Sequence, residues 1–223
     1  MPSCLKDGEK VYNRMISKLV IDSSDALTEL CQFGKVTGTD KSPYNTVAHR
    51  HPYTAVYSML FAPLKSRPIR FAEIGVAMGA SALMWDLYFT NPASKIHMFD
   101  RDQQLLDHTA GMAGRRVMTG LMDVSVDGDV ARALGHESYD VIIDDSSHEH
   151  GHQIRIIKEA FPKLRAGGML IVEDIFRSIA EAEYECEIGD VLKECSAAYF
   201  VMCEHKDRWS PGWDNDKLLV LVK

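Results

Sequence analysis

Apolar runs and helically spaced apolar positions alternate along the chain from about residue 68 onward. The runs predict buried strands at residues 68–74, 95–99, near 117, 139–143, 169–172, 198–203 and 217–222. The helical spacing predicts helices at residues 80–89, 103–112, 128–134, 150–164 (ended by 166–168) and 188–195. Such alternation is typical of a doubly wound, mostly parallel α/β sheet. The last two strands are expected to form an antiparallel hairpin at its edge.

Residues 1–66 have a different pattern. They are amphipathic at helical spacing, and the polar segment 37–44 interrupts them. We therefore expect an N-terminal helical segment that caps the sheet or contacts substrate, followed by a ligand-binding domain at residues 67–223. The two parts are expected to form one compact unit, because 223 residues suffice for a single sizeable core.

The segment FAEIGVAMGAS, at residues 71–81, places an acidic residue and two glycines where a strand turns into a helix. Glu73 and Gly75 fall at the carboxyl end of the strand, where ligands of α/β sheets collect. Gly75 permits a tight turn, and Gly79 lets the helix start close to the strand. Ala77 replaces the glycine that would admit a pyrophosphate. The motif favours a nucleotide-like cofactor without phosphates, such as S-adenosylmethionine (SAM), over a purely structural corner.

Asp100 supports this interpretation. It ends the next predicted strand, 25 residues after Gly75, near the offset of about 20 residues at which an acidic side chain receives ribose hydroxyls. Its alternative is a solvated position in the polar stretch 100–102. Ser81, at the end of the motif, is a further candidate contact of the cofactor.

Composition narrows the possible partners. The chain is 46% hydrophobic but has no apolar stretch near 18 residues, so no membrane span is expected. The formal charge of −7 argues against a nucleic-acid partner, which would need basic patches. The N-terminus has no apolar signal region, and the five cysteines form no CxxC pair. A cytoplasmic protein with reduced cysteines is therefore expected.

Two pairs of carboxylates follow consecutive predicted strands: Asp144 with Asp145, and Glu173 with Asp174. Parallel strands end at the same edge of a sheet, so these side chains should meet in one crevice. Carboxylates repel one another unless a positive group lies between them, and oxygen ligands suit magnesium. The sequence therefore predicts an Mg²⁺ site. For Asp144, capping of the following helix is an equal alternative.

Longer motifs carry a family resemblance. They are YDVIIDDSSHEHGHQ (139–153), LRAGGMLIVEDI (164–175), FGKVTGTDKSPY (33–44), FAPLKSRPIRFAEIGV (61–76) and NDKLLVLV (215–222). Together they resemble the metal-dependent sugar O-methyltransferases of the macrocin and mycinamicin type and the related cephalosporin-hydroxylase-like family. The resemblance implies the Rossmann-like class I methyltransferase fold, SAM as methyl donor, and the hydroxyl of a small, sugar-like molecule as acceptor. It also implies assembly as a homo-oligomer.

The resemblance assigns roles residue by residue. Asp145, Glu173 and Asp174 would hold Mg²⁺, and His148 would be the general base. Lys41, in the GTDK segment, would fold over the cofactor. Asp144 is expected to contact the cofactor as well. Gly120 and Asp123 are expected to border its adenine. Two residues depart from the family pattern: Ser146, where glycine is usual, and Met122, where a polar residue is expected.

The chemistry fits these roles. A hydroxyl is a poor nucleophile until its proton leaves, so a metal held by Asp145 would lower its pKa. An imidazole titrates near neutral pH, so His148 could accept the proton.

Two other functions stay open. His148, Glu149 and His152 form an H-E-x-x-H pattern, which with Glu173 could mark a zinc hydrolase. Gly151 and the preceding strand weaken that reading. A non-catalytic SAM-binding module is the other alternative.

A last group of residues is open to two readings. Five residues could line an acceptor pocket, although positions in a surface loop or on a helix face are the stronger expectation: Tyr44, His49, His51, Tyr53 and Tyr57. Trp209 and Trp213 could form a lid.

Overall fold

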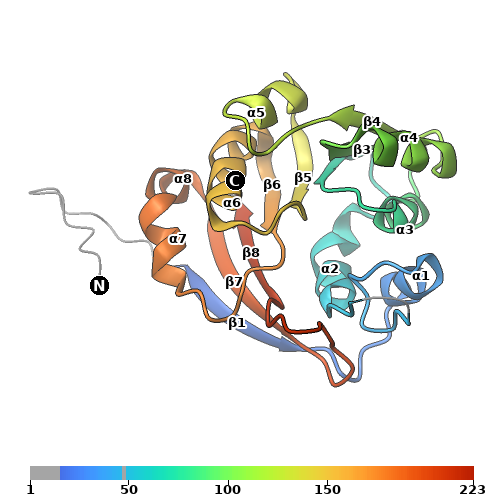
Figure 1. Cartoon of the computed structure of the whole chain (residues 1–223), viewed down its shortest axis with the longest axis horizontal. Helices are drawn as coiled ribbons and strands as arrows, with labels where there is room; N and C mark the ends of the chain where they lie inside the picture. The colour runs from blue at the N-terminus through green and yellow to red at the C-terminus, as the bar shows by residue number, and fades with distance from the viewer. Residues whose placement is uncertain (1–15, 47–48) are drawn as a thin grey trace, which may run out of the picture.

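The computed structural model describes residues 16–46 and 49–223, and Figure 1 shows their arrangement around one twisted sheet. The sheet has eight strands in the order β1-β7-β8-β6-β5-β2-β3-β4. They are β1 (Ser17–Asp22), β2 (Arg70–Ile74), β3 (Lys95–Asp100), β4 (Val117–Leu121), β5 (Tyr139–Asp144), β6 (Leu164–Val172), β7 (Ala197–Glu204) and β8 (Lys217–Val222).

Only β8 runs against its neighbours, since β6 and β7 pair with it antiparallel while the other pairs are parallel. The predicted antiparallel hairpin of the last two strands is therefore present, and the fold class is confirmed. β8 itself lies inside the sheet, however, because β7 and β1 lie outside it.

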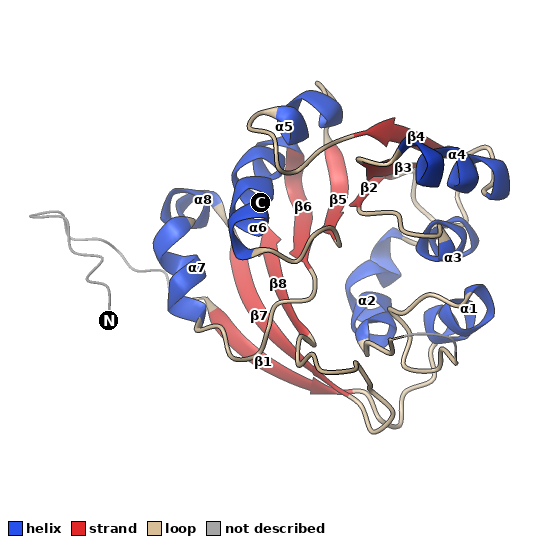
Figure 2. Cartoon of the chain, in the orientation of Figure 1, coloured by secondary structure: helices blue, strands red, loops and turns tan. Residues whose placement is uncertain are grey.

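Helices cover both faces of the sheet (Figure 2). One face packs against α5 (Asp129–Leu134), α6 (His150–Ala160), α7 (Glu181–Glu187) and α8 (Gly189–Glu194). The other packs against α1 (Glu29–Thr37), α2 (Tyr53–Phe61), α3 (Ala80–Tyr88) and α4 (Gln103–Met112). The 3₁₀ turns η1 (Ala62–Leu64) and η2 (Phe161–Lys163) follow α2 and α6. Strand side chains alternate between the two cores, as a pleated strand requires. Both cores therefore form from one set of strands.

Three predicted elements differ from the structure. Residues 17–22 form the edge strand β1, not a helix, because pairing with β7 overrides a local pattern that is mostly exposed. Residues 166–168 belong to β6, and the helix before them stops at Ala160, ahead of Pro162 in the 3₁₀ turn. Helix α7 has no counterpart in the prediction. The remaining residues of the predicted N-terminal segment, 1–15 and 47–48, lie outside the described residues.

Cysteines follow the expectation in part. Cys31, Cys195 and Cys203 are buried and are not disulfide-bonded, whereas Cys186 is disulfide-bonded, contrary to the expected reduced state. Among the described helices, none combines the length and apolarity needed to cross a bilayer.

Candidate active site

The turn after β2 meets the turn after β5. Gly75 has a φ of 100°, and its N–H donates to the Phe99 carbonyl at 2.7 Å. A Cβ at this position would lie 1.9 Å from the main-chain oxygen of Asp145. Only glycine permits both the positive φ and this approach. The predicted tight turn at Gly75 is thus present, and it brings the motif against Asp145.

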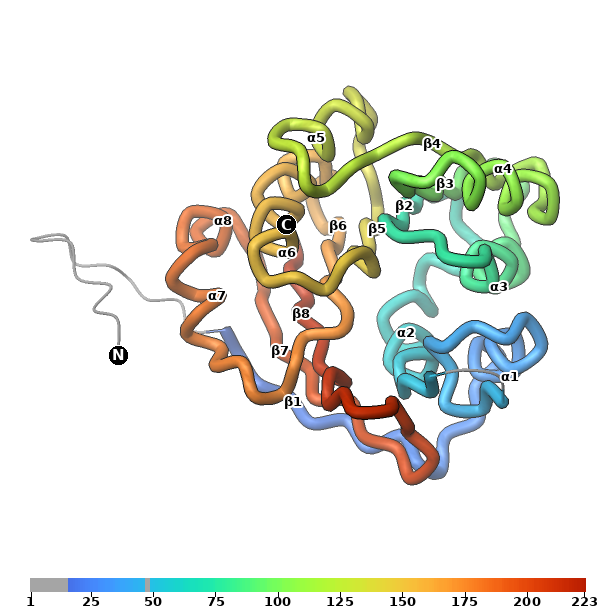
Figure 3. Tube along the Cα trace, viewed as in Figure 1, coloured from blue at the N-terminus to red at the C-terminus, as the bar shows by residue number. Residues whose placement is uncertain are grey.

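A pocket of about 310 Å³ opens beside this turn, at the carboxyl ends of β2, β3 and β5. Ligands of α/β sheets bind at such strand ends. The continuous trace in Figure 3 shows the three strands approaching one another from separate parts of the sequence. The residues that line the pocket are Ile74, Gly75, Ala77, Asp100, Arg101, Met122, Asp123, Val124, Ser125, Asp145, Ser146, Ser147, Glu149 and His152.

Three of the predicted cofactor residues line this pocket: Gly75, Asp100 and Asp123. Asp100 also stabilises the glycine turn, because its Oδ2 accepts the N–H of Val76 at 2.9 Å. A carboxylate oxygen has two lone pairs, so this bond leaves acceptor capacity for a ligand. Met122 lies in the pocket at the position where the family pattern has a polar residue.

Glu73 lies elsewhere. Strand alternation directs it to the α2–α3 face, where its side chain is fully buried. The hydroxyl of Ser81 donates to its Oε1 at 2.6 Å, and the indole N–H of Trp85 donates to Oε2. Burial raises the pKa of Glu73, and the charge of Lys41 opposes that rise. Glu73 and Ser81 thus bond to each other under the motif and are not among the residues lining the pocket.

The other predicted cofactor glycines serve packing. A Cβ on Gly79, where φ is 77°, would lie 2.7 Å from Oγ1 of Thr109 in α4. One on Gly120 would lie 2.8 Å from the ring of Phe99. Neither glycine is among the pocket-lining residues. These two positions therefore need glycine for close approach of neighbouring elements.

Asp144 forms a local turn. Its Oδ1 accepts the Ser146 hydroxyl at 2.6 Å and the Ser146 N–H at 3.2 Å. Burial raises the pKa of Asp144 to about 6, and the bonds from Ser146 limit the rise. Asp144 therefore does not cap the following helix as the alternative expected, because α6 has Glu149 at its N-cap. Ser146, the departure from the family pattern, supplies both donors of the local turn.

Three of the residues predicted for catalysis or metal binding converge beside the pocket: Asp145, His148 and Asp174. One side-chain ligand atom from each lies within 4.8 Å of the others. The imidazole Nε2 of His148 is 3.3 Å from Oδ1 of Asp145 and 3.3 Å from Oδ2 of Asp174. Burial alone would lower the pKa of His148, but the two carboxylates raise it to about 9. His148 and Asp174 both have positive φ, at 58° and 57°.

The cluster also contains a lysine that sequence reasoning assigned to the cofactor. The Lys41 ammonium donates to Oε2 of Glu173 at 2.8 Å, forms a close ion pair with Asp145, and lies 3.7 Å from Glu73. It is buried and is not among the pocket-lining residues. The chain thus supplies a positive group between its own carboxylates. The only signal in the sequence was a lysine within the polar stretch 37–44.

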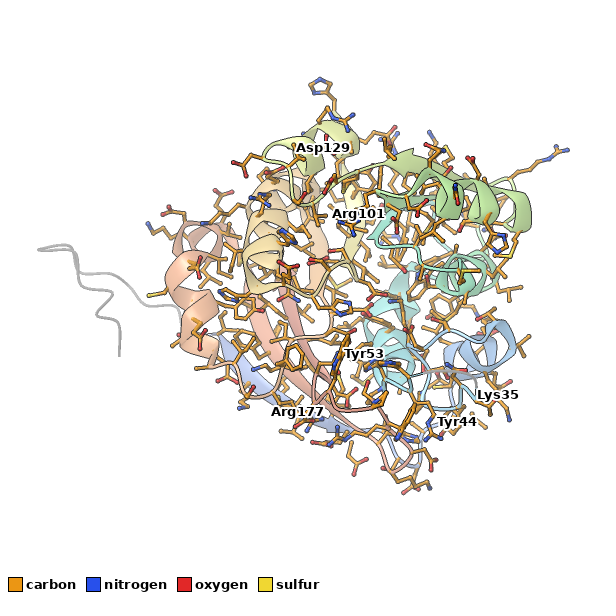
Figure 4. All side chains as sticks on the ribbon, in the orientation of Figure 1. Lys35, Tyr44, Tyr53, Arg101, Asp129 and Arg177 are labelled. Carbon is orange, nitrogen blue, oxygen red and sulfur yellow. The ribbon has the colours of Figure 1, made fainter. Side chains whose placement is uncertain are left out.

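Glu173 is held on both oxygens. Lys41 occupies Oε2, and the hydroxyl of Tyr57 donates to Oε1 at 2.6 Å. Glu173 is therefore outside the cluster that converges on His148, although the resemblance assigned it to the metal. Asp174 keeps Oδ2 toward His148, while its Oδ1 accepts from the hydroxyl of Tyr53 at 2.6 Å. Tyr53 is labelled in Figure 4.

The donor set fits a hard divalent cation. Asp145 and Asp174 each present a carboxylate oxygen 3.3 Å from Nε2 of His148. Mg²⁺ binds through one or two carboxylates and keeps several waters, so these two side chains are enough. Glu173 is not required for such a site.

The zinc-helix alternative does not fit the geometry. His148 precedes α6 in a left-handed backbone conformation, so the two histidines are not on one helix face. His152 turns to Ser147, whose Oγ is 2.7 Å from its Nδ1. Over residues 16–46 and 49–223, the metal-competent cluster consists of Asp145, His148 and Asp174, without His152.

The aromatic residues suggested for an acceptor pocket lie in three different surroundings. His51, Tyr53 and Tyr57 are buried, and they hold carboxylates instead of lining open space. Tyr44 donates to the Ala26 carbonyl at 2.8 Å. His49 alone is next to exposed aromatic rings, those of Trp209 and Trp213.

Comparisons with known proteins point to methyltransferases. Residues 72–175 match a family model described as a methyltransferase domain. Over 135 residues the chain is 33% identical to the 8-demethyl-8-alpha-L-rhamnosyl tetracenomycin-C 2'-O-methyltransferase of Streptomyces olivaceus, covering 56% of this chain and 33% of that protein. The chain spans about a third of the length of the curated relatives it matches.

Solved structures with the same fold include two methyltransferases. One is MycE from the mycinamycin pathway, solved with Mg, SAH (S-adenosylhomocysteine) and mycinamycin VI, with a TM-score of 0.63, 18% identity, and coverage of 88% of this chain and 54% of that one. The other is TomG from Streptomyces achromogenes, solved with SAM, with a TM-score of 0.58, 16% identity, and coverage of 90% and 93%. The chain thus has a class I methyltransferase fold, and its residues 72–175 match the methyltransferase domain. The predicted resemblance to the sugar O-methyltransferases is confirmed.

Proposed function

We propose that the chain transfers a methyl group from SAM to a hydroxyl of a small molecule, and that the acceptor is a sugar of a natural product. One observation carries the proposal: Asp145 belongs to both halves of the site. Its main chain contacts Gly75 of the cofactor turn and it lines the pocket, while its side chain lies beside His148 and Asp174. A methyl donor in the pocket would therefore lie next to a base and two carboxylates.

The cofactor would occupy the pocket, whose volume of about 310 Å³ is in the range of small-molecule sites. Gly75 would let the ligand approach the turn closely, and Asp100 would receive its hydroxyls. Asp123 and the apolar Met122 would border its base. SAM, when bound, supplies an electrophilic methyl sulfonium. The relatives support this assignment, since MycE and TomG are solved with SAH and SAM.

Asp145 and Asp174 would hold Mg²⁺. The ion, when bound, lowers the pKa of an acceptor hydroxyl and orients it. His148 would take the proton of that hydroxyl as the oxygen attacks the methyl carbon and the carbon–sulfur bond breaks. A base must be neutral, yet the two carboxylates favour the charged imidazole. Offsetting their negative charge is therefore a condition for His148 to act.

Several finer expectations stay predictions. They are a cytoplasmic location, assembly as a homo-oligomer, and the absence of nucleic-acid and membrane partners. A substrate-facing role of residues 1–66 also stays a prediction. Its support is that α2, within this segment, supplies Tyr53 and Tyr57 to the carboxylates.

The test compares wild type with His148→Ala and with His136→Ala, a control at an exposed histidine that does not line the pocket. Isothermal titration measures SAM binding, and SAH release measures turnover over a panel of glycosides, with Mg²⁺ and with a chelator. We expect wild-type turnover that needs Mg²⁺, SAM binding by all three proteins, and loss of turnover in His148→Ala alone. SAM binding without turnover on any acceptor would favour the non-catalytic module, and peptidase activity with bound zinc would favour the hydrolase.

A further inference from the structure

Trp213 is an exposed aromatic side chain at the edge of the catalytic cluster. The residue is 48% exposed, although large aromatic residues normally bury most of their surface. Its ring centroid lies 6.3 Å from that of His148, in an edge-on arrangement. The exposed ring therefore borders the imidazole that we assign as the base.

The ring is held in place from several sides. Phe176 and His49 lie 6.2 Å and 5.6 Å from it, centroid to centroid. The turn before it is fastened because Oγ of Ser210 is 2.8 Å from Nδ1 of His49. The residue after it, Asp214, accepts the N–H of Arg177 at 2.8 Å through its carbonyl. Trp213 is thus a pre-ordered apolar surface, which a ligand can use without first ordering the loop.

Two kinds of surface meet here. Trp213 and Phe176 offer apolar rings, and the imidazole of His148 lies beside Trp213, with the carboxylates of Asp145 and Asp174 next to that imidazole. Small-molecule sites combine aromatic walls with a few convergent polar groups in this way. A pyranose ring matches both, because one face consists of C–H groups and its edge carries hydroxyls. A purely apolar ligand would match the rings but would present no hydroxyl to His148.

We propose that Trp213, supported by Phe176 and His49, is the platform on which the sugar ring of the acceptor stacks. This inference rests on the proposed methyltransferase function. The C–H face of the sugar packs on the indole, and its hydroxyl edge faces His148 and the two aspartates. Trp213 thereby selects a carbohydrate acceptor and positions its hydroxyl toward the cofactor pocket.

The chain offers a matched control. Trp209 lies in the same loop and is 47% exposed, close to the value for Trp213. Its ring contacts among the described residues are with His49, at 6.3 Å, and with the guanidinium of Arg50, at 5.7 Å. Its main chain pairs with that of Arg50. Removing Trp209 therefore removes an equally exposed indole that does not border His148.

The experiment uses protein saturated with SAH and Mg²⁺, and methyl α-L-rhamnopyranoside as the probe. Saturation-transfer NMR reports which ring protons contact the protein, and titration of that signal gives the affinity. We expect one C–H face of the sugar to be saturated in wild type. Trp213→Ala should lower the affinity for the probe at least about fivefold. Trp213→Phe should retain part of the affinity, and Trp209→Ala should match wild type.

Two results would overturn the platform: equal affinity of Trp213→Ala and wild type, or equal weakening by both tryptophan variants. Trp213-dependent binding of catechol in place of the glycoside would overturn the sugar assignment. Titration of SAH into each variant separates failure of the platform from failure of the proposed function. If Trp213→Ala binds SAH and binds the sugar as tightly as wild type does, only the platform is wrong. If wild type does not bind SAH, the proposed function itself is wrong.

Discussion

The ammonium of Lys41 donates to Oε2 of Glu173 at 2.8 Å, and both side chains are buried almost completely. The pair joins residues 132 positions apart. Burial alone would lower the pKa of Lys41, but the charges of Asp145, Glu173 and Glu73 raise it well above its usual value. Lys41 therefore stays charged, and the acidic cluster contains a fixed positive group before any metal binds.

Removing that charge should destabilise the fold. Lys41→Met would leave buried carboxylates without their partner, and breaking a buried ion pair in this way costs about 3–5 kcal/mol. Urea unfolding measures the loss. The matched control is Lys65→Met, because Lys65 pairs with Glu29 at the surface and such pairs contribute less than about 1 kcal/mol. Equal stability of the two variants would show that the buried pair contributes no more than the surface pair.

Magnesium binding should distinguish Asp174 from Glu173. Asp174 presents an oxygen to the cluster around His148, while Lys41 and Tyr57 occupy both oxygens of Glu173. We expect Asp174→Asn to lower the affinity for Mg²⁺ about 100-fold or more, and Glu173→Gln to lower it less than about tenfold. Isothermal titration of SAH-saturated protein measures both. A loss in Glu173→Gln as large as in Asp174→Asn would make Glu173 a metal ligand, as the family resemblance implies.

The convergence of Asp145, His148 and Asp174 was predictable, because the ends of neighbouring parallel strands meet at one edge of the sheet. The partner of Glu173 was not. Lys41 comes from a polar segment far away in the sequence, and only tertiary packing brings it into the cluster. The sequence predicted a metal as the positive group between the carboxylates, and the chain supplies a positive group of its own, Lys41.

Glu73 illustrates a second limit. The sequence located it correctly near the end of β2, but a strand turns successive side chains to opposite faces. Ile74 lies in the core beneath α5 and α6, so Glu73 faces α3 and bonds Ser81. In the same way, β1 has a helix-like local pattern, and its pairing with β7 decides its structure.

Gly75→Ala should impair the cofactor turn. The new Cβ would collide with the main chain of Asp145, which cannot move aside as a flexible side chain could, and φ would stay strained. We expect SAM affinity to fall at least about tenfold and stability to fall by about 1–3 kcal/mol. Isothermal titration and urea unfolding measure the two effects.

Gly128→Ala is the control for that variant. Gly128 has a φ of 78°, and a Cβ there would meet nothing within 4 Å. It should lose about 1 kcal/mol through backbone strain and bind SAM as wild type does. A similar loss of SAM affinity in both variants would mean that the contact with Asp145 has no part in binding.

His97 should make stability depend on pH. Its ring is half-buried, with Nδ1 2.9 Å from the hydroxyl of Tyr139, and burial lowers its pKa while Glu137 opposes the shift. The unfolded chain, with a pKa of about 6.5, therefore binds the proton more readily than the folded one. The contribution of neutral His97 is complete above that pH and is lost as the pH falls through the folded pKa.

Urea unfolding between about pH 5 and pH 8 tests this, with a slope of at most about 1.4 kcal/mol per pH unit for one proton. His97→Asn keeps a polar atom near the position of Nδ1 but does not titrate. The stability of wild type relative to this variant should therefore rise with pH up to about 7 and then level off. His136→Asn, at an exposed position, should leave the profile unchanged. A difference that is constant over the whole range would show that His97 does not change protonation on unfolding.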